Sequence, residues 1–336
     1  MTAAAVWQIT ESPGAIPDLR LTPLPSATPG EPVQVAVELG QSPREIGEML
    51  EELGVIDSAI QFRVLVALLG YDRMLQAGDY EFDPGTPALE AVYRMRRGII
   101  SSRFVTVVEG WRLAQIADAL QEHGIPRQEF LAAARAGDYD FDFLQDLDPD
   151  QSLEGYLFPA TYYFRRKDTA RDIVQRMLQA FDQNFTPELR DEAARAGLTV
   201  HDVLTIASII EREAQVPEER PIMAQVFLKR LRLGMRLEAD PTVQYAVAAD
   251  PASVASFGWW KKGLTESDLQ VDSPYNTYAN AGLPPGPIAS PGQASIEAAA
   301  RPTETDYLYF VARPDGSHAF ARTLAEHLRN VEQYQR

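Results

Sequence analysis

The stretch VLTIASIIEREAQ, residues 203–215, decides the fold of the C-terminal half of this chain. At about 100° per residue, Val203, Ile206 and Ile210 fall on one side of a helix. Glu213 follows Ile210 by three positions and Ile206 by seven, so it extends this apolar side. The sequence therefore predicts an amphipathic helix that carries a carboxyl group at the end of its apolar side.

A carboxyl group in such a place is desolvated, which raises its pKa and favours the protonated form near neutral pH. That property suits a general acid. Arg212 points the other way, and Glu211 lies at the far margin of the apolar side, so the pattern favours Glu213 over Glu211. The alternative is that Glu213 forms only the solvated last turn, and periodicity alone favours that alternative. Asp202 is expected to cap the start of the helix.

The chain on the C-terminal side of this helix changes from helical to loop-rich. A second helix is predicted over 218–233, ending at Gly234. The segment SPYNTYANAGLPPGPIASPG, residues 273–292, is rich in Pro and Gly and predicts a long ordered loop of the kind that often carries function. A short helix at 295–302, a strand at 307–312 and a C-terminal helix complete an α+β pattern.

An internal repeat precedes the helical region. The segment VQVAVELGQSPREIGEMLEELGVI, residues 33–56, recurs seventy residues later as FVTVVEGWRLAQIADALQEHGIP, residues 104–126. Each copy predicts a short strand, a glycine turn and an amphipathic helix closed by glycine. The repeat is either a ligand-binding module or a duplicated structural unit, and both alternatives stay open. Residues 1–32 are rich in Pro, Ala, Ser and Thr and are predicted to form a linker.

The aromatic stretch LEGYLFPATYYF, residues 153–164, allows two interpretations. Its Tyr and Phe side chains beside a proline turn could line a sugar-binding cleft. Spacing alone favours a packed corner between elements.

Composition excludes several classes of protein. The 336 residues carry a formal net charge of −17 spread along the chain, which argues against nucleic-acid binding. The absence of cysteine removes disulfides, thiolate chemistry and cysteine-based zinc sites, and the four histidines show no metal-ligand spacing. No apolar run reaches the roughly 20 residues that span a membrane. Motifs of serine hydrolases, P-loop proteins, zincins and dinucleotide-binding proteins do not occur.

Four blocks of the C-terminal half resemble a known family, the endolytic murein transglycosylases (MltG or YceG-like proteins). They are IASIIEREAQ at 206–215, VFLKRLRLGMRLEADPTVQYA at 226–246, the loop at 273–292 and YLYFVARPDGSHAF at 307–320. The resemblance covers roughly residues 33–336. It implies a linker or membrane-proximal arm at 1–32, a LysM-like strand–helix region at 33–125 and a catalytic domain at 126–336 with a lysozyme-like active-site helix.

The resemblance also implies an activity and its residues. Family members cut the β-1,4 bond between MurNAc and GlcNAc in nascent peptidoglycan without water, which terminates strand elongation and leaves 1,6-anhydro-MurNAc ends. The family's catalytic glutamate falls on Glu213, with no metal or organic cofactor. The positions implied to line the glycan cleft are Glu154, Tyr156, Gln244, Tyr245, Tyr275, Asn276, Thr277 and Tyr278. His318 and His327 match family positions without an assigned role.

The family's partners and location follow as expectations. The substrate is a peptidoglycan glycan strand, and the partners are peptidoglycan synthases of elongation or division. The family carries a single N-terminal membrane anchor and acts on the extracytoplasmic face of the cytoplasmic membrane, whereas this sequence contains no such span. Two alternatives remain: a hydrolytic muramidase that uses water and a second acid such as Asp240, and a non-catalytic scaffold that binds peptidoglycan.

Overall fold

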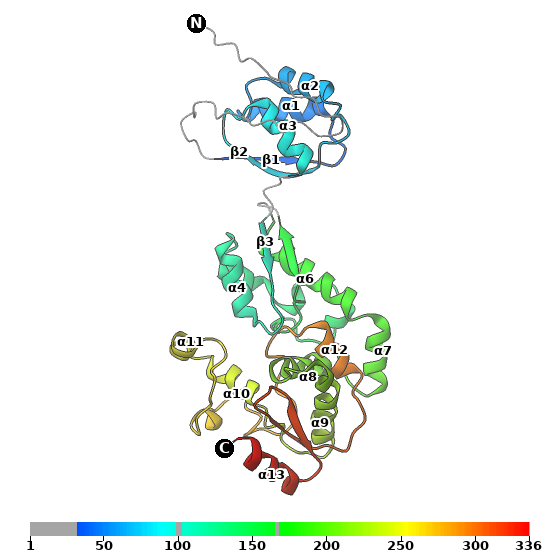
Figure 1. Ribbon diagram of the computed structural model, residues 1–336, viewed down its shortest axis with the longest axis vertical. Helices are drawn as coiled ribbons and strands as arrows, with labels where there is room; N and C mark the ends of the chain where they lie inside the picture. Colours follow the sequence, from blue (N-terminus) through cyan, green and yellow to red (C-terminus); the bar gives the residue numbers. More distant parts are fainter. Residues whose placement is uncertain (1–31, 99–102, 165–167, 336) are drawn as a thin grey trace. The chain divides into compact units, whose positions relative to one another are not determined.

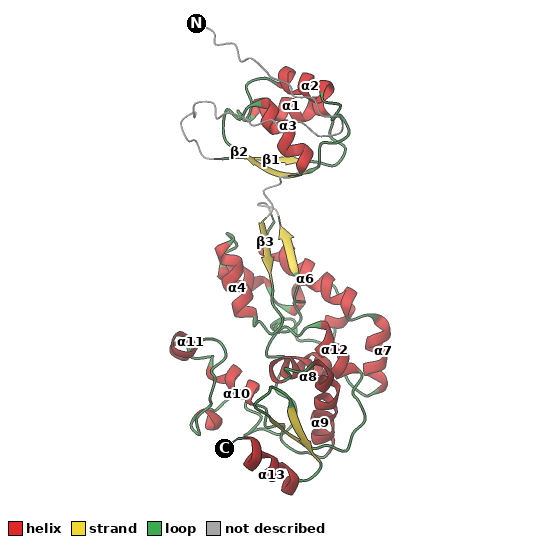
Figure 2. Ribbon diagram, viewed as in Figure 1, coloured by secondary structure: helices red, strands yellow, loops and turns green. Residues whose placement is uncertain are grey.

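The computed structural model describes residues 32–98, 103–164 and 168–335, and these form two compact units divided after Ser102. Both units mix helices with small antiparallel sheets, so the predicted α+β class is confirmed (Figure 2). The predicted linker, except for its last residue, lies outside the described residues.

The smaller unit packs three helices against a two-stranded sheet (Figure 1). Its elements are β1 (Val33–Val37), α1 (Pro43–Glu52), α2 (Ala59–Leu68), β2 (Gly78–Phe82) and α3 (Ala88–Arg97). β1 runs antiparallel to β2, with Val35 opposite Tyr80. Both of these side chains are buried with Leu50 and Phe62 in a core of its own, as expected for alternating strands that cover one face with amphipathic helices.

The larger unit is mainly helical. Its first elements are β3 (Arg103–Thr106), α4 (Leu113–Glu122), α5 (Arg127–Ala133), β4 (Thr161–Phe164), α6 (Ala170–Asn184) and α7 (Pro187–Arg195). The chain continues through α8 (Val200–Glu213), α9 (Arg220–Arg232), α10 (Asp240–Val247), α11 (Pro251–Phe257), α12 (Gln293–Ala300), β5 (Tyr309–Ala312), β6 (His318–Ala321) and α13 (Leu324–Tyr334). β3 pairs with β4 and β5 pairs with β6, both antiparallel. The segment 273–292 contains no helix or strand, as predicted.

The two copies of the repeat have the predicted local form. Each has a strand, a turn at a glycine with positive φ (91° at Gly40 and 77° at Gly110), and a helix of ten residues. The two units divide after Ser102, so the second copy belongs to the larger unit. The reason is packing: β3 pairs with β4 from the larger unit, and the apolar side of α4 enters the larger core.

Helix α8 is the central element of the larger unit and packs against α9, α10 and α12. Every side chain from Val203 to Ile210 is buried. The helix begins three residues earlier than predicted. Thr199 is the cap, and its hydroxyl accepts from the Asp202 amide at 3.1 Å while the Asp202 carboxylate accepts from the Thr199 amide at 2.9 Å. This reciprocal arrangement is a capping box, and it satisfies two otherwise free amides. Asp202 is the third helical residue, and Thr199 is the N-cap.

No single helix among the described residues is both long and apolar enough to cross a membrane; α7 and α8 meet that requirement only as a pair bent by 94°.

Candidate functional site

Glu213 is the last residue of α8, where the helix leaves the core. The side chains of Ile209 and Ile210 just before it have no exposed surface, and Ala214 after it is also buried. Glu213 itself is partly exposed. It therefore combines two properties that periodicity could not decide between: it ends the helix, and it still lies against the apolar interior.

The carboxyl group of Glu213 is held in its protonated form near neutral pH. Burial raises its pKa to about 8, and the negative charge of Asp240 adds to the effect. Across the three described ranges, no group donates a hydrogen bond to this carboxyl, so nothing stabilises its ionised form. A carboxylic acid that keeps its proton at pH 7 and reaches solvent can donate it to a bound molecule.

Asp240 and Tyr278 stand beside Glu213. Asp240 is the first residue of α10, which packs against α8, and its carboxylate accepts from the Tyr278 hydroxyl at 2.7 Å. Asp240 is exposed, whereas Tyr278 is partly buried. Burial raises the pKa of Tyr278, and the charges of Asp240 and Glu213 raise it further, which places the three groups in one neighbourhood.

Glu211 has a different environment. Its carboxylate accepts from the Gly292 amide at 3.0 Å and from the Ser295 hydroxyl at 2.7 Å, at the start of α12. These bonds occupy the group and satisfy free donors of the α12 N-terminus. Glu211 therefore holds α8 to α12, and Glu213 is the carboxyl of this pair that is left for chemistry.

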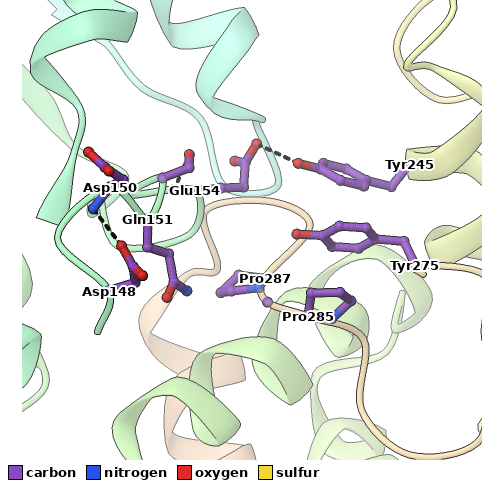
Figure 3. Close-up of a pocket in the computed structure, with 10 residues that line it drawn as sticks. Asp148, Asp150, Gln151, Glu154, Tyr245, Tyr275, Pro285 and Pro287 are labelled. Atoms are coloured by element: carbon purple, nitrogen blue, oxygen red, sulfur yellow. Dashed lines mark hydrogen bonds between the residues drawn. The ribbon is translucent and has the colours of Figure 1, made fainter. Parts of the chain in front are cut away.

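A cavity of about 560 Å³ lies near the other end of α10 (Figure 3). It is lined by Asp148, Asp150, Gln151, Ser152, Glu154, Tyr245, Tyr275, Pro285, Gly286 and Pro287. In Figure 3 the Tyr245 and Tyr275 rings lie next to each other, with the two proline rings below them. The tyrosine ring centroids are 4.7 Å apart. Polar groups and ring faces in a cavity of this volume suit a polar ligand that contains rings.

Glu154 is the buried carboxyl group of this cavity. It accepts from the Leu113 amide at 2.8 Å and from the Tyr245 hydroxyl at 3.3 Å. Burial raises its pKa to about 8 although these bonds and Arg112 oppose the shift. The larger unit thus contains two carboxyl groups that stay protonated at neutral pH, Glu154 in the cavity and Glu213 at the end of α8.

The eight predicted cleft residues separate into two groups. Glu154, Tyr245 and Tyr275 line the cavity, and Tyr278 lies beside Glu213. The other four hold the structure together and are described next.

Tyr156 has no exposed surface, and its hydroxyl is 2.9 Å from His201 Nδ1. It therefore belongs to the packed corner that spacing favoured for this stretch. Asn276 donates to the Leu269 and Val271 carbonyls, and the Thr277 hydroxyl lies 2.8 Å from that of Thr242.

Gln244 is partly buried and donates to the Lys261 carbonyl at 2.9 Å. These four side chains therefore hold the elements around the site in place and do not line the cavity.

No pattern in the sequence indicated the cluster that Arg112, Arg212 and Trp260 form. The guanidinium carbons of Arg112 and Arg212 lie 3.9 Å and 4.2 Å from the Trp260 ring centroid. Arg112 also lies 4.7 Å from the Tyr245 ring, so the cluster adjoins the cavity wall. The partners are separated by tens of residues in the chain, and no local pattern marks such contacts. Among the described residues, no group of three or more His, Asp or Glu is arranged to hold a metal ion.

A protonated carboxyl at the end of a buried helix, together with a polar cavity walled by tyrosines near the far end of the neighbouring helix α10, defines a protein that can bind a ring-containing polar ligand and that carries a general acid. Residues 35–333 match the sequence model of the YceG-like family. The chain belongs to this family.

Named relatives agree with this assignment. The chain is 35% identical over 316 residues to the endolytic murein transglycosylase of Bacillus subtilis, covering 90% of this chain and 84% of that protein. It is 31% identical to the endolytic murein transglycosylase of Streptococcus pneumoniae strain D39, covering 90% of this chain and 58% of that longer protein. A crystal structure of a YceG-like protein from Listeria monocytogenes superposes with a TM-score of 0.58 at 36% identity, covering 89% of this chain and 99% of that one.

Proposed function

We propose that this protein is an endolytic lytic transglycosylase that cuts the MurNAc–GlcNAc β-1,4 bond of nascent peptidoglycan strands. The observation that carries the proposal is the environment of Glu213, a solvent-reaching carboxyl group whose burial raises its pKa to about 8. The relatives named endolytic murein transglycosylases supply the reaction and the substrate. The activity ends strand elongation by releasing the strand with a 1,6-anhydro-MurNAc end.

The reaction needs one acid that becomes a base. Glu213 gives its proton to the glycosidic oxygen as the bond to MurNAc C1 breaks, and GlcNAc leaves with a new hydroxyl group. The 6-hydroxyl of the same MurNAc then bonds to C1, and the Glu213 carboxylate takes the hydroxyl proton, which restores the acid. The nucleophile is already tethered to the reacting carbon, so no water has to be positioned.

The cavity at Glu154 is proposed to hold sugars of the strand. The Tyr245 and Tyr275 rings offer faces for pyranose rings, and Glu154 offers a hydrogen-bonding carboxyl group. Helix α10 starts at Asp240, beside Glu213, and its residue Tyr245 lines the cavity. These two positions are separated by about 8 Å along the helix axis. That separation allows one strand to occupy the cavity and present its neighbouring bond to Glu213.

The hydrolytic alternative would require Asp240 to activate water. Asp240 is exposed and already accepts a hydrogen bond from Tyr278. Its negative charge raises the pKa of Glu213, which is the contribution a one-acid mechanism needs. The relatives' names also favour transglycosylation over hydrolysis and over a scaffold without activity.

Three finer features belong to the same proposal. The smaller unit is proposed to act as a LysM-like module, with support from its strand–helix construction. The protein is proposed to act at the extracytoplasmic face of the cytoplasmic membrane, where nascent strands are made. Peptidoglycan synthases are the proposed partners, because they supply those strands.

A pair of glutamate variants tests the function. Glu213→Gln keeps the side-chain shape but removes the transferable proton, and we expect strand cleavage to fall by at least about a thousandfold. Glu211→Gln is the matched control, since it lies two residues away and its role is to bind the start of α12. Cleavage per folded molecule should stay within a few-fold of wild type in this control. Equal losses in the two variants would contradict the assignment.

A further inference from the structure

Two arginines share one tryptophan at the edge of the site. Arg112, next to the start of α4, and Arg212, in the last turn of α8, lie 3.9 Å and 4.2 Å from the Trp260 ring centroid. Cation–π contacts at such distances are favourable, and the planar guanidinium stacks well on an indole. Burial lowers the pKa of Arg112, and the two cations are close enough for the charge of Arg212 to lower it further.

Neither arginine forms an ion pair among the residues that the structure describes, although the charge of Glu211 acts on Arg212 and that of Glu154 on Arg112. Arg112 is buried and donates to two α10 carbonyls, those of Gln244 at 3.1 Å and Tyr245 at 3.3 Å, while its Nε has no acceptor. Arg212 makes no hydrogen bond to the described part of the chain, and its Nε is buried without an acceptor. Its guanidinium donors are therefore available.

Eight other cations of the larger unit each form an ion pair. Ion pairs join Arg127 to Asp118, Arg171 to Asp138, Arg176 to Asp168, Arg190 to Asp182, Lys229 to Asp306, Arg230 to Glu238, Lys261 to Asp268 and Arg301 to Glu192. The chain has 48 acidic residues for 31 basic ones, so counter-ions are abundant. A partly buried cation without an ion pair is costly, and an incoming anion would reduce that cost.

The position of Arg212 is fixed by its surroundings. A side chain at Gly110 would place its Cβ 2.8 Å from Arg212 Nη1, so the glycine makes room for the guanidinium. The loop that holds Gly110 is tied to the segment before α12, since the Gly110 amide donates to the Ser290 carbonyl at 2.8 Å and the Ser290 amide donates to the Trp111 carbonyl at 2.7 Å. Arg212 is thus held in place before any ligand arrives.

We propose that Arg212, supported by Trp260 and the charge of Arg112, binds a carboxylate of the peptide stem that a muramic acid residue of the strand carries. This inference rests on the proposed function, because Arg212 directly precedes Glu213, the residue proposed to cut the strand. The bond is a charge-assisted pair between a guanidinium fork and a carboxylate, which arginine forms in two-point geometry. The consequence is selection for strands whose stem carboxylates are free.

The test compares two substrates that differ only in charge. Uncrosslinked peptidoglycan strands are used as they are, and a second portion has its stem carboxyl groups converted to primary amides. We expect the wild-type kcat/KM to be about tenfold higher on the carboxylate strands, the usual scale of one charge-assisted hydrogen bond. Arg212→Gln should lower kcat/KM about tenfold on the carboxylate strands and leave the amidated strands unchanged.

Two further variants separate binding from structure. Arg195→Gln removes an exposed arginine at the end of α7 and should change neither substrate. Arg212→Lys keeps the charge without the fork and should recover part of the preference, with thermal melting used to confirm that each variant folds. If Arg212→Gln slows both substrates equally, its role is structural and the proposal is overturned. The proposal is equally overturned if the wild-type enzyme shows no preference.

Strand binding by Glu213→Gln protein gives a readout that does not depend on cleavage. This protein should bind carboxylate strands about tenfold more tightly than amidated ones, and adding Arg212→Gln should remove the difference. Equal affinities would overturn the stem site even if cleavage proceeds as proposed. A preserved difference would support the stem site even if the cleavage reaction proved to be another one.

Discussion

Replacing Asp240 by asparagine should move the alkaline limit of activity toward lower pH. Glu213 must be protonated to act, so activity falls as the pH rises through its pKa of about 8. At pH 7 a group with this pKa is about nine-tenths protonated, whereas a carboxyl group with the ordinary value of 4.5 would be about 0.3% protonated. The environment of Glu213 therefore accounts for about a 300-fold larger active fraction at neutral pH.

Burial is the main cause of this shift and Asp240 the smaller one. Asp240 is exposed, so its charge acts through a water-like dielectric. Coulomb's law then gives about 1 kcal/mol between unit charges about 4 Å apart and less at longer distances, which corresponds to at most about 0.7 of a pKa unit. Asp240→Asn removes a negative charge that disfavours ionisation of Glu213. The pKa of Glu213 should drop, and the alkaline limb should move by about half a unit to lower pH.

The assay is the pH dependence of kcat/KM for strand cleavage between pH 5 and 10. Glu238→Gln is the matched control, because Glu238 is an exposed carboxylate two residues from Asp240 that pairs with Arg230, whereas burial and Asp240 raise the pKa of Glu213. The reasoning is refuted if the alkaline limb of the wild-type kcat/KM profile lies near pH 5. It is also refuted if both variants shift the limb equally.

Three further outcomes follow from the packing around the site. Gly155→Ala should destabilise the fold by about 3 kcal/mol in denaturant unfolding, because Gly155 has a φ of 82° and a new Cβ would collide with the Pro287 ring; a change below 1 kcal/mol would contradict this. Tyr156→Phe should cost about 1–2 kcal/mol, since it leaves His201 Nδ1 without its partner, and should leave the pH limits of cleavage unchanged. Glu213→Gln should match wild-type stability near pH 4 and exceed it at pH 8. The raised pKa of Glu213 contributes stability that is fully present below its ordinary value of 4.5 and is lost as the pH rises to about 8; equal stabilities at pH 8 would argue against a desolvated carboxyl.

Local patterns predicted the elements around the site well. The helix through Glu213, the helix that ends near Gly234 and the long loop at 273–292 all occur as expected. Each depends on neighbours in the chain, through helical periodicity, a glycine stop or a high content of Pro and Gly. The same local logic located the strand–turn–helix form of both repeats.

Features that depend on distant contacts could not be read in this way. The second repeat belongs to the larger unit because β3 pairs with β4 more than fifty residues later, a contact that no local pattern shows. Periodicity alone favoured a solvated Glu213, because it does not show that α10 and the loop with Tyr278 close around the helix end. The stacking of Arg212 on Trp260 joins residues with no pattern in common.

The chemical form of the product tests the central claim most directly. Peptidoglycan strands would be digested by the wild-type protein in water enriched in oxygen-18, and the new ends analysed by mass spectrometry. Transfer to the sugar's own 6-hydroxyl, with Glu213 as acid and base, predicts 1,6-anhydro-MurNAc ends that contain no oxygen-18. Reducing MurNAc ends that carry oxygen-18 would mean that water is the nucleophile, and they would contradict the proposed reaction.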